Sequence, residues 1–77
     1  MTLSEINKGA RVKIISIPDD EIRAQAIRLG ISEGAAAECL FRFERGPVLL
    51  NIGGQEIAIG NSLAEKIEVG LSQNKGQ

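Results

Sequence analysis

Alternating apolar and polar residues near the start of the chain predict a first β-strand. Val12 and Ile14 point to one side of the segment ARVKIISI, and the basic residues beside them point to the other. The alternation breaks at Ile15, which indicates either a bulge or a strand that becomes covered on both faces. Pro18 follows, and because proline has no backbone N–H we expect the strand to end before it.

The apolar spacing in DDEIRAQAIRLG predicts one α-helix after this strand. Asp19 or Asp20 would cap its N-terminus, since a side-chain oxygen there accepts free backbone N–H groups. Gly30 stands where a left-handed residue commonly ends a helix. The expected buried stripe consists of Ile22, Ala26 and Leu29.

Four more strands follow the helix. Residues 35–44 form a long alternating segment, and one of its faces carries Ala35, Ala37, Cys39, Phe41 and Phe43. The dipeptide Gly53-Gly54 is typical of a two-residue hairpin between two further strands. It sets Leu50 opposite Ile57 on the apolar face, with similar pairs on either side. A last short strand would end near Val69.

Capping-box sequences predict a single helical turn near each end of the chain. TLSE places Glu5 three residues after Thr2, and SLAE places Glu65 three residues after Ser62. The elements together predict a mainly β fold. It is a small, strongly bent barrel of five strands, with one helix between the first and second strands. We expect this domain to span residues 1–70 and a flexible tail to span residues 71–77.

Size and composition restrict the classes of function. The 77 residues form one domain with 43% hydrophobic residues but only two aromatic ones, so the core must be aliphatic. Nine basic and ten acidic residues give a net charge of −1, which together with the few aromatics argues against nucleic-acid binding. The absence of a recognisable signal peptide or membrane span, with a single cysteine, predicts a cytoplasmic protein.

No combination of side chains predicts catalysis or a cofactor. Cys39 has no histidine to activate it, and its place in a strand favours a buried, inert thiol over a reactive or metal-binding one. Asp19, Asp20 and Glu21 form the only acidic cluster. Helix capping explains these acids better than a cation site does, although they are the candidates for a divalent metal. We therefore expect a protein that is not an enzyme.

A surface that binds another protein is the remaining candidate for function. Leu49 lies on the polar face of its strand, and Ile27 lies off the helical stripe. Arg23, Arg28 and Arg45 could frame these side chains, because interfaces favour arginine and buried aliphatic anchors. We expect this contact surface around the helix end and the ERGP turn. The alternatives are that isolated exposed aliphatics have no function, or that strand edges near Leu49 form a weak homodimer.

The order of these elements resembles the FeoA family of ferrous iron transport proteins, which are small SH3-like barrels. The resemblance extends from Leu3 to Val69. It rests on three segments, LSEINKGARVKI, AIRLGISEGAAAEC and RGPVLLNIGGQEIAIGNSLAEKIEV. Each segment alone is compatible with other small barrels, whereas their order and spacing together are specific.

The resemblance implies a non-enzymatic, cytoplasmic accessory protein of ferrous iron transport. Its implied partner is a FeoB-type transporter, bound through the cytosolic G domain or the membrane part, so that the protein reaches the membrane only through this partner. The alternative is a metal-sensing regulatory module related to the SH3-like domain of metal-dependent repressors. In that module Asp19, Asp20 and Glu21 would help to bind a cation.

Overall fold

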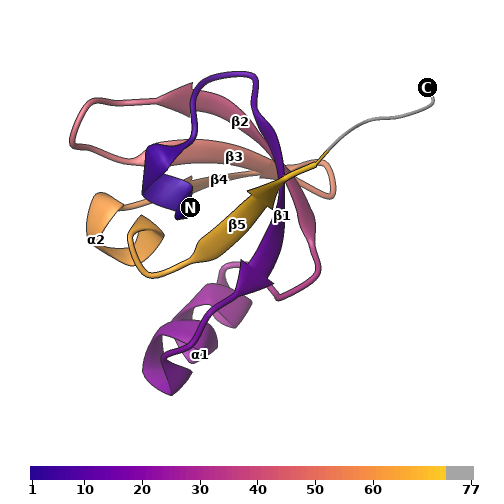
Figure 1. The fold of residues 1–77 in the computed structure, drawn as a ribbon, viewed down its shortest axis with the longest axis vertical. Helices are drawn as coiled ribbons and strands as arrows, with labels where there is room; N and C mark the ends of the chain where they lie inside the picture. The colour runs from indigo at the N-terminus through magenta and orange to yellow at the C-terminus, as the bar shows by residue number, and fades with distance from the viewer. Residues whose placement is uncertain (73–77) are drawn as a thin grey trace.

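The computed structural model describes residues 1–72 of the chain. Its elements in chain order are the 3-10 turn η1 (Leu3–Glu5), β1 (Arg11–Ser16), α1 (Asp20–Arg28), β2 (Ala36–Arg42), β3 (Val48–Ile52), β4 (Gln55–Ile59), α2 (Asn61–Ala64) and β5 (Glu68–Leu71). The strands form one antiparallel sheet in the order β4-β3-β2-β1-β5 (Figure 1). The prediction of a mainly β fold with five strands, one helix between the first two and short helical turns near both ends is confirmed.

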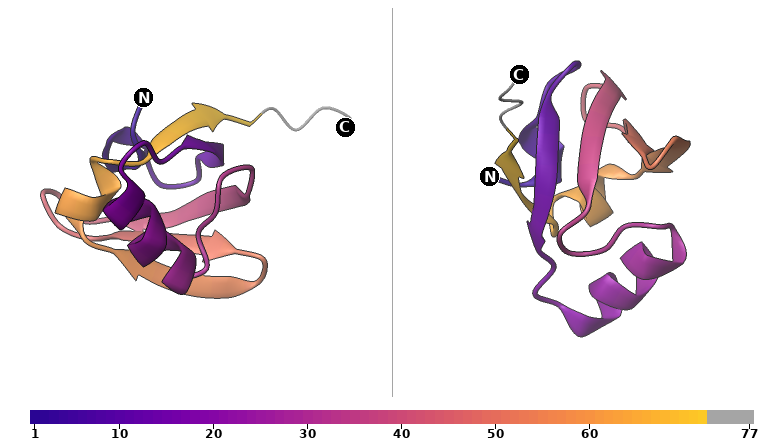
Figure 2. Two further views of the ribbon diagram at one scale, coloured as in Figure 1. Left: turned by 90° about the horizontal axis from the view of Figure 1, so that it is seen from below. Right: turned by 90° about the vertical axis from the view of Figure 1, so that its right-hand side faces the viewer.

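The sheet curls around an aliphatic core, and α1 lies across one of its ends (Figure 2). No polar or charged side chain among residues 1–72 is buried, which agrees with a core made by the hydrophobic effect alone. The largest fully buried side chains are Leu3, Ile14, Ile17, Ile31, Leu50, Ile59 and Ile67.

A bulge interrupts β1 where its alternation breaks. The pairing of β1 with β5 shifts register between Ile14 and Ser16, and Ile15 is 57% exposed. Of the two alternatives that the sequence left open, the bulge is therefore correct and coverage of both faces is wrong. The strand ends at Ser16, before Pro18, as predicted.

A second bulge lies in β2 and overturns the predicted face of its aromatic residues. The pairing of β2 with β3 shifts register between Cys39 and Phe41. One extra residue reverses the side to which all later side chains of a strand point. Cys39 is therefore buried as predicted, whereas Phe41 and Phe43 face outward with 42% and 53% of their surface exposed.

The β3–β4 hairpin has the predicted register. Leu50 pairs with Ile57 and Asn51 with Glu56, and Gly53-Gly54 forms the turn with both φ angles positive. This register follows from the two-residue loop and from the apolar pattern, which agree with each other.

The helix α1 begins as predicted but ends one residue earlier than its apolar spacing suggested. The Asp19 carboxylate accepts the N–H groups of Glu21 at 2.9 Å and Ile22 at 3.2 Å, so Asp19 is the cap. Leu29 was predicted to be buried, but it is the C-cap and is 42% exposed. After Gly30, at φ +94°, Ile31 is fully buried and donates its N–H to the Ala26 carbonyl at 2.8 Å.

Two predictions near the C-terminus need correction. SLAE is not a capping box, because α2 begins at Asn61 after an extended Gly60, which leaves Ser62 inside the helix. The domain was predicted to end at Gly70, but β5 continues to Leu71, which pairs with Val12. Ladder hydrogen bonds to β1 hold this end in place. The rest of the predicted tail, residues 73–77, lies outside the described residues.

Candidate functional site

Arg23, predicted to contact a partner, forms a hydrogen bond and ion pairs within its own fold. Its Nη1 donates to the Ile17 carbonyl at 2.7 Å, and its guanidinium pairs with Asp20 and, at 3.9 Å, with Glu33. Glu33 in turn accepts the N–H of Ile17 at 2.8 Å. Arg23 and Glu33 therefore close the segment between β1 and α1, and both terminal nitrogens of Arg23 have a hydrogen-bond partner within the fold.

The acidic cluster at the start of α1 does not converge on one point. Asp19 caps the helix and Asp20 pairs with Arg23, so these two carboxylates already have partners. Glu21 follows in the first turn. Within residues 1–72 no three Asp, Glu, Cys or His side chains lie together so as to hold a metal ion. The local geometry is that of a helix N-terminus whose dipole is compensated by acids.

The other predicted contact residues fall at two ends of the sheet. Ile27 and Arg28 are exposed at the end of α1, where Gly30 lies against Gln55 and Ile57 beside the Gly53-Gly54 turn. Arg45 lies in the β2–β3 turn at the opposite end of β3, and Leu49 is the second residue of that strand. In Figure 1 this turn is at the upper left and α1 is at the bottom. Leu49 and Arg45 therefore lie toward one end of the sheet, and Ile27 and Arg28 toward the other.

Leu49 belongs to an apolar area on the outer face of the sheet, which we call the outer patch. Phe41 pairs with Leu49 across β2 and β3, and Leu49 pairs with Ala58 across β3 and β4. The rings of Phe41 and Phe43 meet edge to face, with centroids 4.7 Å apart and planes at 63°. The outer patch consists of Phe41, Phe43, Leu49 and Ala58.

One basic side chain lies over the outer patch, and a second basic residue belongs to the turn that follows Phe43. Lys8 Nζ lies 5.8 Å from the centroid of the Phe41 ring, within the range of a cation–π contact. Arg45 stands in the turn closed by the Gly46 N–H, which donates to the Phe43 carbonyl at 3.0 Å. Arg45 has φ +58°, in the left-handed region that favours glycine.

Sequence reasoning missed Phe41 and Phe43 as surface residues, and it did not single out Lys8 as a candidate contact residue. Strict alternation along residues 35–44 predicted that both aromatic side chains share the face of Cys39. No residue of this segment indicates the position of the bulge. The length of the predicted strand was the one available signal, because strands of about ten residues often contain a bend.

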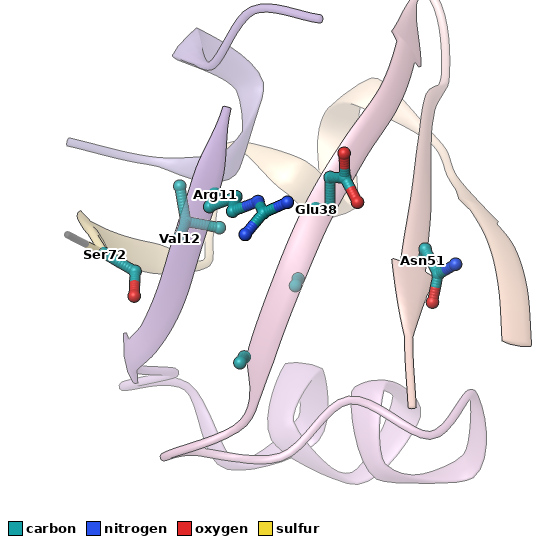
Figure 3. Close-up of a pocket in the computed structure, with 7 residues that line it drawn as sticks. Arg11, Val12, Glu38, Asn51 and Ser72 are labelled. Atoms are coloured by element: carbon teal, nitrogen blue, oxygen red, sulfur yellow. The ribbon is translucent and has the colours of Figure 1, made fainter. Parts of the chain in front are cut away.

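A shallow groove of about 330 Å³ lies on the sheet beside β1. Arg11 and Glu38 are cross-strand partners there, and Asn51 pairs with Glu38 on the next strand (Figure 3). Ala36 and Ala37 of β2 also line the groove. The groove offers a guanidinium, a carboxylate, an amide and the Ser72 hydroxyl to a polar ligand.

The one thiol of the chain is inert in this structure. Cys39 is 1% exposed, and burial raises the pKa of its thiol despite the opposing effects of the Phe41 backbone and the Arg42 charge. A raised pKa keeps the thiol protonated at neutral pH, and a thiol is a weak nucleophile. This agrees with the predicted buried cysteine.

Comparison with known proteins supports this architecture. A crystal structure of an iron uptake regulatory protein, FeoA, is 27% identical and superposes with a TM-score of 0.87, covering 94% of this chain and 97% of that one. The FeoA protein from Chlorobium tepidum is 29% identical, with a TM-score of 0.78 and coverage of 99% and 75%. No curated protein sequence matches. These likenesses confirm the predicted SH3-like barrel.

Metal-dependent repressors share the fold. A manganese-dependent transcriptional repressor superposes with a TM-score of 0.81 at 23% identity, and this chain corresponds to 40% of its length. At that identity the likeness concerns the fold alone. Neither helix within residues 1–72 is long and apolar enough to cross a bilayer.

The model of the FeoA domain matches residues 1–71. That match includes every element of the sheet, from η1 to the end of β5. The chain therefore belongs to the FeoA family.

Proposed function

We propose that this protein is a non-enzymatic accessory protein of ferrous iron transport that binds a FeoB-type transporter and modulates iron uptake. The binding site on the transporter would be its cytosolic G domain or its membrane part, which puts this chain in the cytoplasm. The observation that carries the proposal is the FeoA-domain match over residues 1–71.

Membership of the FeoA family supports a role in ferrous iron transport, because FeoA is a family of small accessory proteins and not of known enzymes. The chemistry of the described residues is compatible with such a role. The interior is filled by aliphatic side chains, and the one thiol is buried. A small barrel of this kind acts through its surface.

The surface predicted from the sequence is divided between two ends of the sheet, and we place the contact at the end that holds Leu49 and Arg45. Ile27 and Arg28 form the competing contact region at the end of α1. Arg23 is the weakest of the predicted contact residues, since its guanidinium is held by Ile17, Asp20 and Glu33.

Binding to the purified transporter tests the proposal. The full chain, immobilised, is expected to retain an intact FeoB-type transporter in nanodiscs and to change its rate of iron uptake in proteoliposomes. A chain that retains no transporter at about 100 µM, a concentration that detects even weak complexes, would rule out direct docking. Size exclusion of the free protein tests the predicted weak homodimer in the same preparation.

A metal-sensing module is the second candidate, because repressors that respond to metals share the fold. Titration with Mn²⁺ or Fe²⁺, followed by amide NMR spectra, separates the two candidates. The sensor requires saturable shifts at Asp19, Asp20 and Glu21, whereas the accessory role requires none there. The caps and ion pair already formed by Asp19 and Asp20 favour the accessory role.

A further inference from the structure

The only two aromatic residues of the chain are both on its surface. Phe41 and Phe43 are 42% and 53% exposed, and their rings contact each other rather than the core. The β2 bulge turns them outward and places Phe41 beside Leu49. Exposed aromatic side chains that gather at one place are typical of binding surfaces, where such residues provide most of the affinity.

Two basic and two acidic residues lie at or near the outer patch, and the two basic ones form no ion pair among residues 1–72. Among residues 1–72, neither Lys8 nor Arg45 has a carboxylate within ion-pair distance, in contrast to Arg23, which has two. Glu44 is the acid of the same turn, and Glu56 lies two residues from Ala58 at the other side of the patch. A ligand that places carboxylates near Lys8 and Arg45 would complement this distribution.

Arg45 has a positive φ in the turn next to the outer patch. Its φ of +58° is a conformation that costs an L-residue free energy and that glycine adopts freely. Backbone strain of this kind is found mostly where a side chain is needed for binding or catalysis. The turn that the Gly46 N–H closes accounts for this φ at its third residue, while the exposed Arg45 guanidinium has no ion-pair partner among the described residues.

The shape of the outer patch fits one helix. It crosses β2, β3 and β4, and three strands spaced about 4.8 Å apart give a surface about 10 Å wide. This equals the diameter of an α-helix, about 10–12 Å. An amphipathic helix can place residues i, i+3 or i+4, and i+7 on such a surface.

A second copy of the chain fits less well. Lys8 lies over the Phe41 ring, so stacking two outer patches would bring two ammonium groups together.

We infer that the outer patch binds an amphipathic helix of the transporter, whose apolar stripe contacts Phe41, Phe43 and Leu49 and whose acidic flank contacts Lys8 and Arg45. This inference rests on the proposed function, because it takes its partner from there.

Affinity measurements with single variants test the inference. The probe is an intact FeoB-type transporter in nanodiscs, and the full chain is titrated at low and high salt. Phe41→Ser and Phe43→Ser are expected to weaken binding at least about tenfold, as hot-spot residues do. Lys8→Glu, which leaves the apolar side chains in place, is expected to weaken it about fivefold and to reduce its salt dependence.

A matched control is Ile15→Thr, which changes an equally exposed aliphatic residue in the β1 bulge. This variant should bind the transporter as tightly as the wild type does.

Four outcomes would overturn the inference. If the wild type binds while the Phe41, Phe43 and Lys8 variants bind equally well, the inference is wrong and the proposed function stands. If Ile27→Ser alone abolishes binding, the end of α1 is the site instead. If the wild type does not bind, the proposed function fails and the inference fails with it. A dimer that Phe41→Ser dissociates would assign the outer patch to self-association and also overturn the inference.

Discussion

Arg23 donates from Nη1 to the carbonyl oxygen of Ile17 across the turn that joins β1 to α1, at 2.7 Å. The same Ile17 donates its N–H to Glu33, which approaches Arg23 to 3.9 Å. One arginine and one glutamate therefore satisfy both backbone groups of a buried residue that belongs to no strand or helix.

Arg23→Ala is expected to lower the free energy of unfolding by about 1–2 kcal/mol. Hydrogen bonds to charged groups contribute about 1.5–3 kcal/mol, and partial exposure of the side chain reduces this figure. Urea unfolding followed by circular dichroism measures the change. Arg28→Ala on the same helix is the control, and it should change stability by less than about 0.5 kcal/mol.

Arg45→Gly is expected to raise the free energy of unfolding by up to about 1 kcal/mol. Glycine removes the cost of a positive φ, of about 1–2 kcal/mol, but makes the unfolded chain more flexible. The same variant should bind the transporter more weakly than the wild type. Arg45→Ala separates the two effects, since it removes the charge and keeps the strain. An unchanged stability for the glycine variant would contradict the assignment of strain to Arg45.

Gly30→Ala is expected to destabilise the protein by about 1–2 kcal/mol. A methyl group there would meet Ile57 Cδ1 at an ordinary 3.5 Å, so the cost comes from φ +94° and not from a clash. Gly30→Asn should cost less, because asparagine tolerates positive φ better than alanine. Thermal unfolding of the two variants compares them, and equal losses would show that crowding rather than backbone conformation sets the cost.

The Cys39 thiol should make stability depend on pH above neutrality. In the unfolded chain a cysteine ionises near pH 8.5, while burial holds the pKa of the Cys39 thiol above its usual value in the folded protein. Above pH 8.5 the folded state therefore binds more protons than the unfolded state. Its stability falls as pH rises toward the folded pKa, by at most about 1.4 kcal/mol per pH unit. Below that range both states are protonated and the effect disappears.

Urea unfolding of the wild type and of Cys39→Ala between pH 7 and pH 9.5 checks this expectation. The alanine variant should be less stable at pH 7, because it loses buried volume, but should lack the additional decline. A thiol that reacts quickly with a disulfide reagent in the folded protein at pH 7 would contradict the buried, protonated state.

Sequence determined the features of this protein that depend on neighbours along the chain. The two-residue loop at Gly53-Gly54 fixed the register of the β3–β4 hairpin, because that loop length permits one pairing that also aligns the apolar residues. Asp19 and Gly30 determined the two ends of α1 in the same way, since capping is a contact between residues two to five positions apart.

Only the tertiary structure decided which way Phe41 and Phe43 face. It also decided which of the two arginines of α1 forms ion pairs within the described part of the fold. A bulge depends on how two strands match along their whole length, and the residues around Leu40 would fit either face. Arg23 and Arg28 look alike in the sequence, but Glu33 comes near Arg23 through the path of the chain after the helix. Contacts between distant segments select among conformations that local sequence leaves nearly equal in free energy, and this is why the candidate binding surface appeared only in the folded chain.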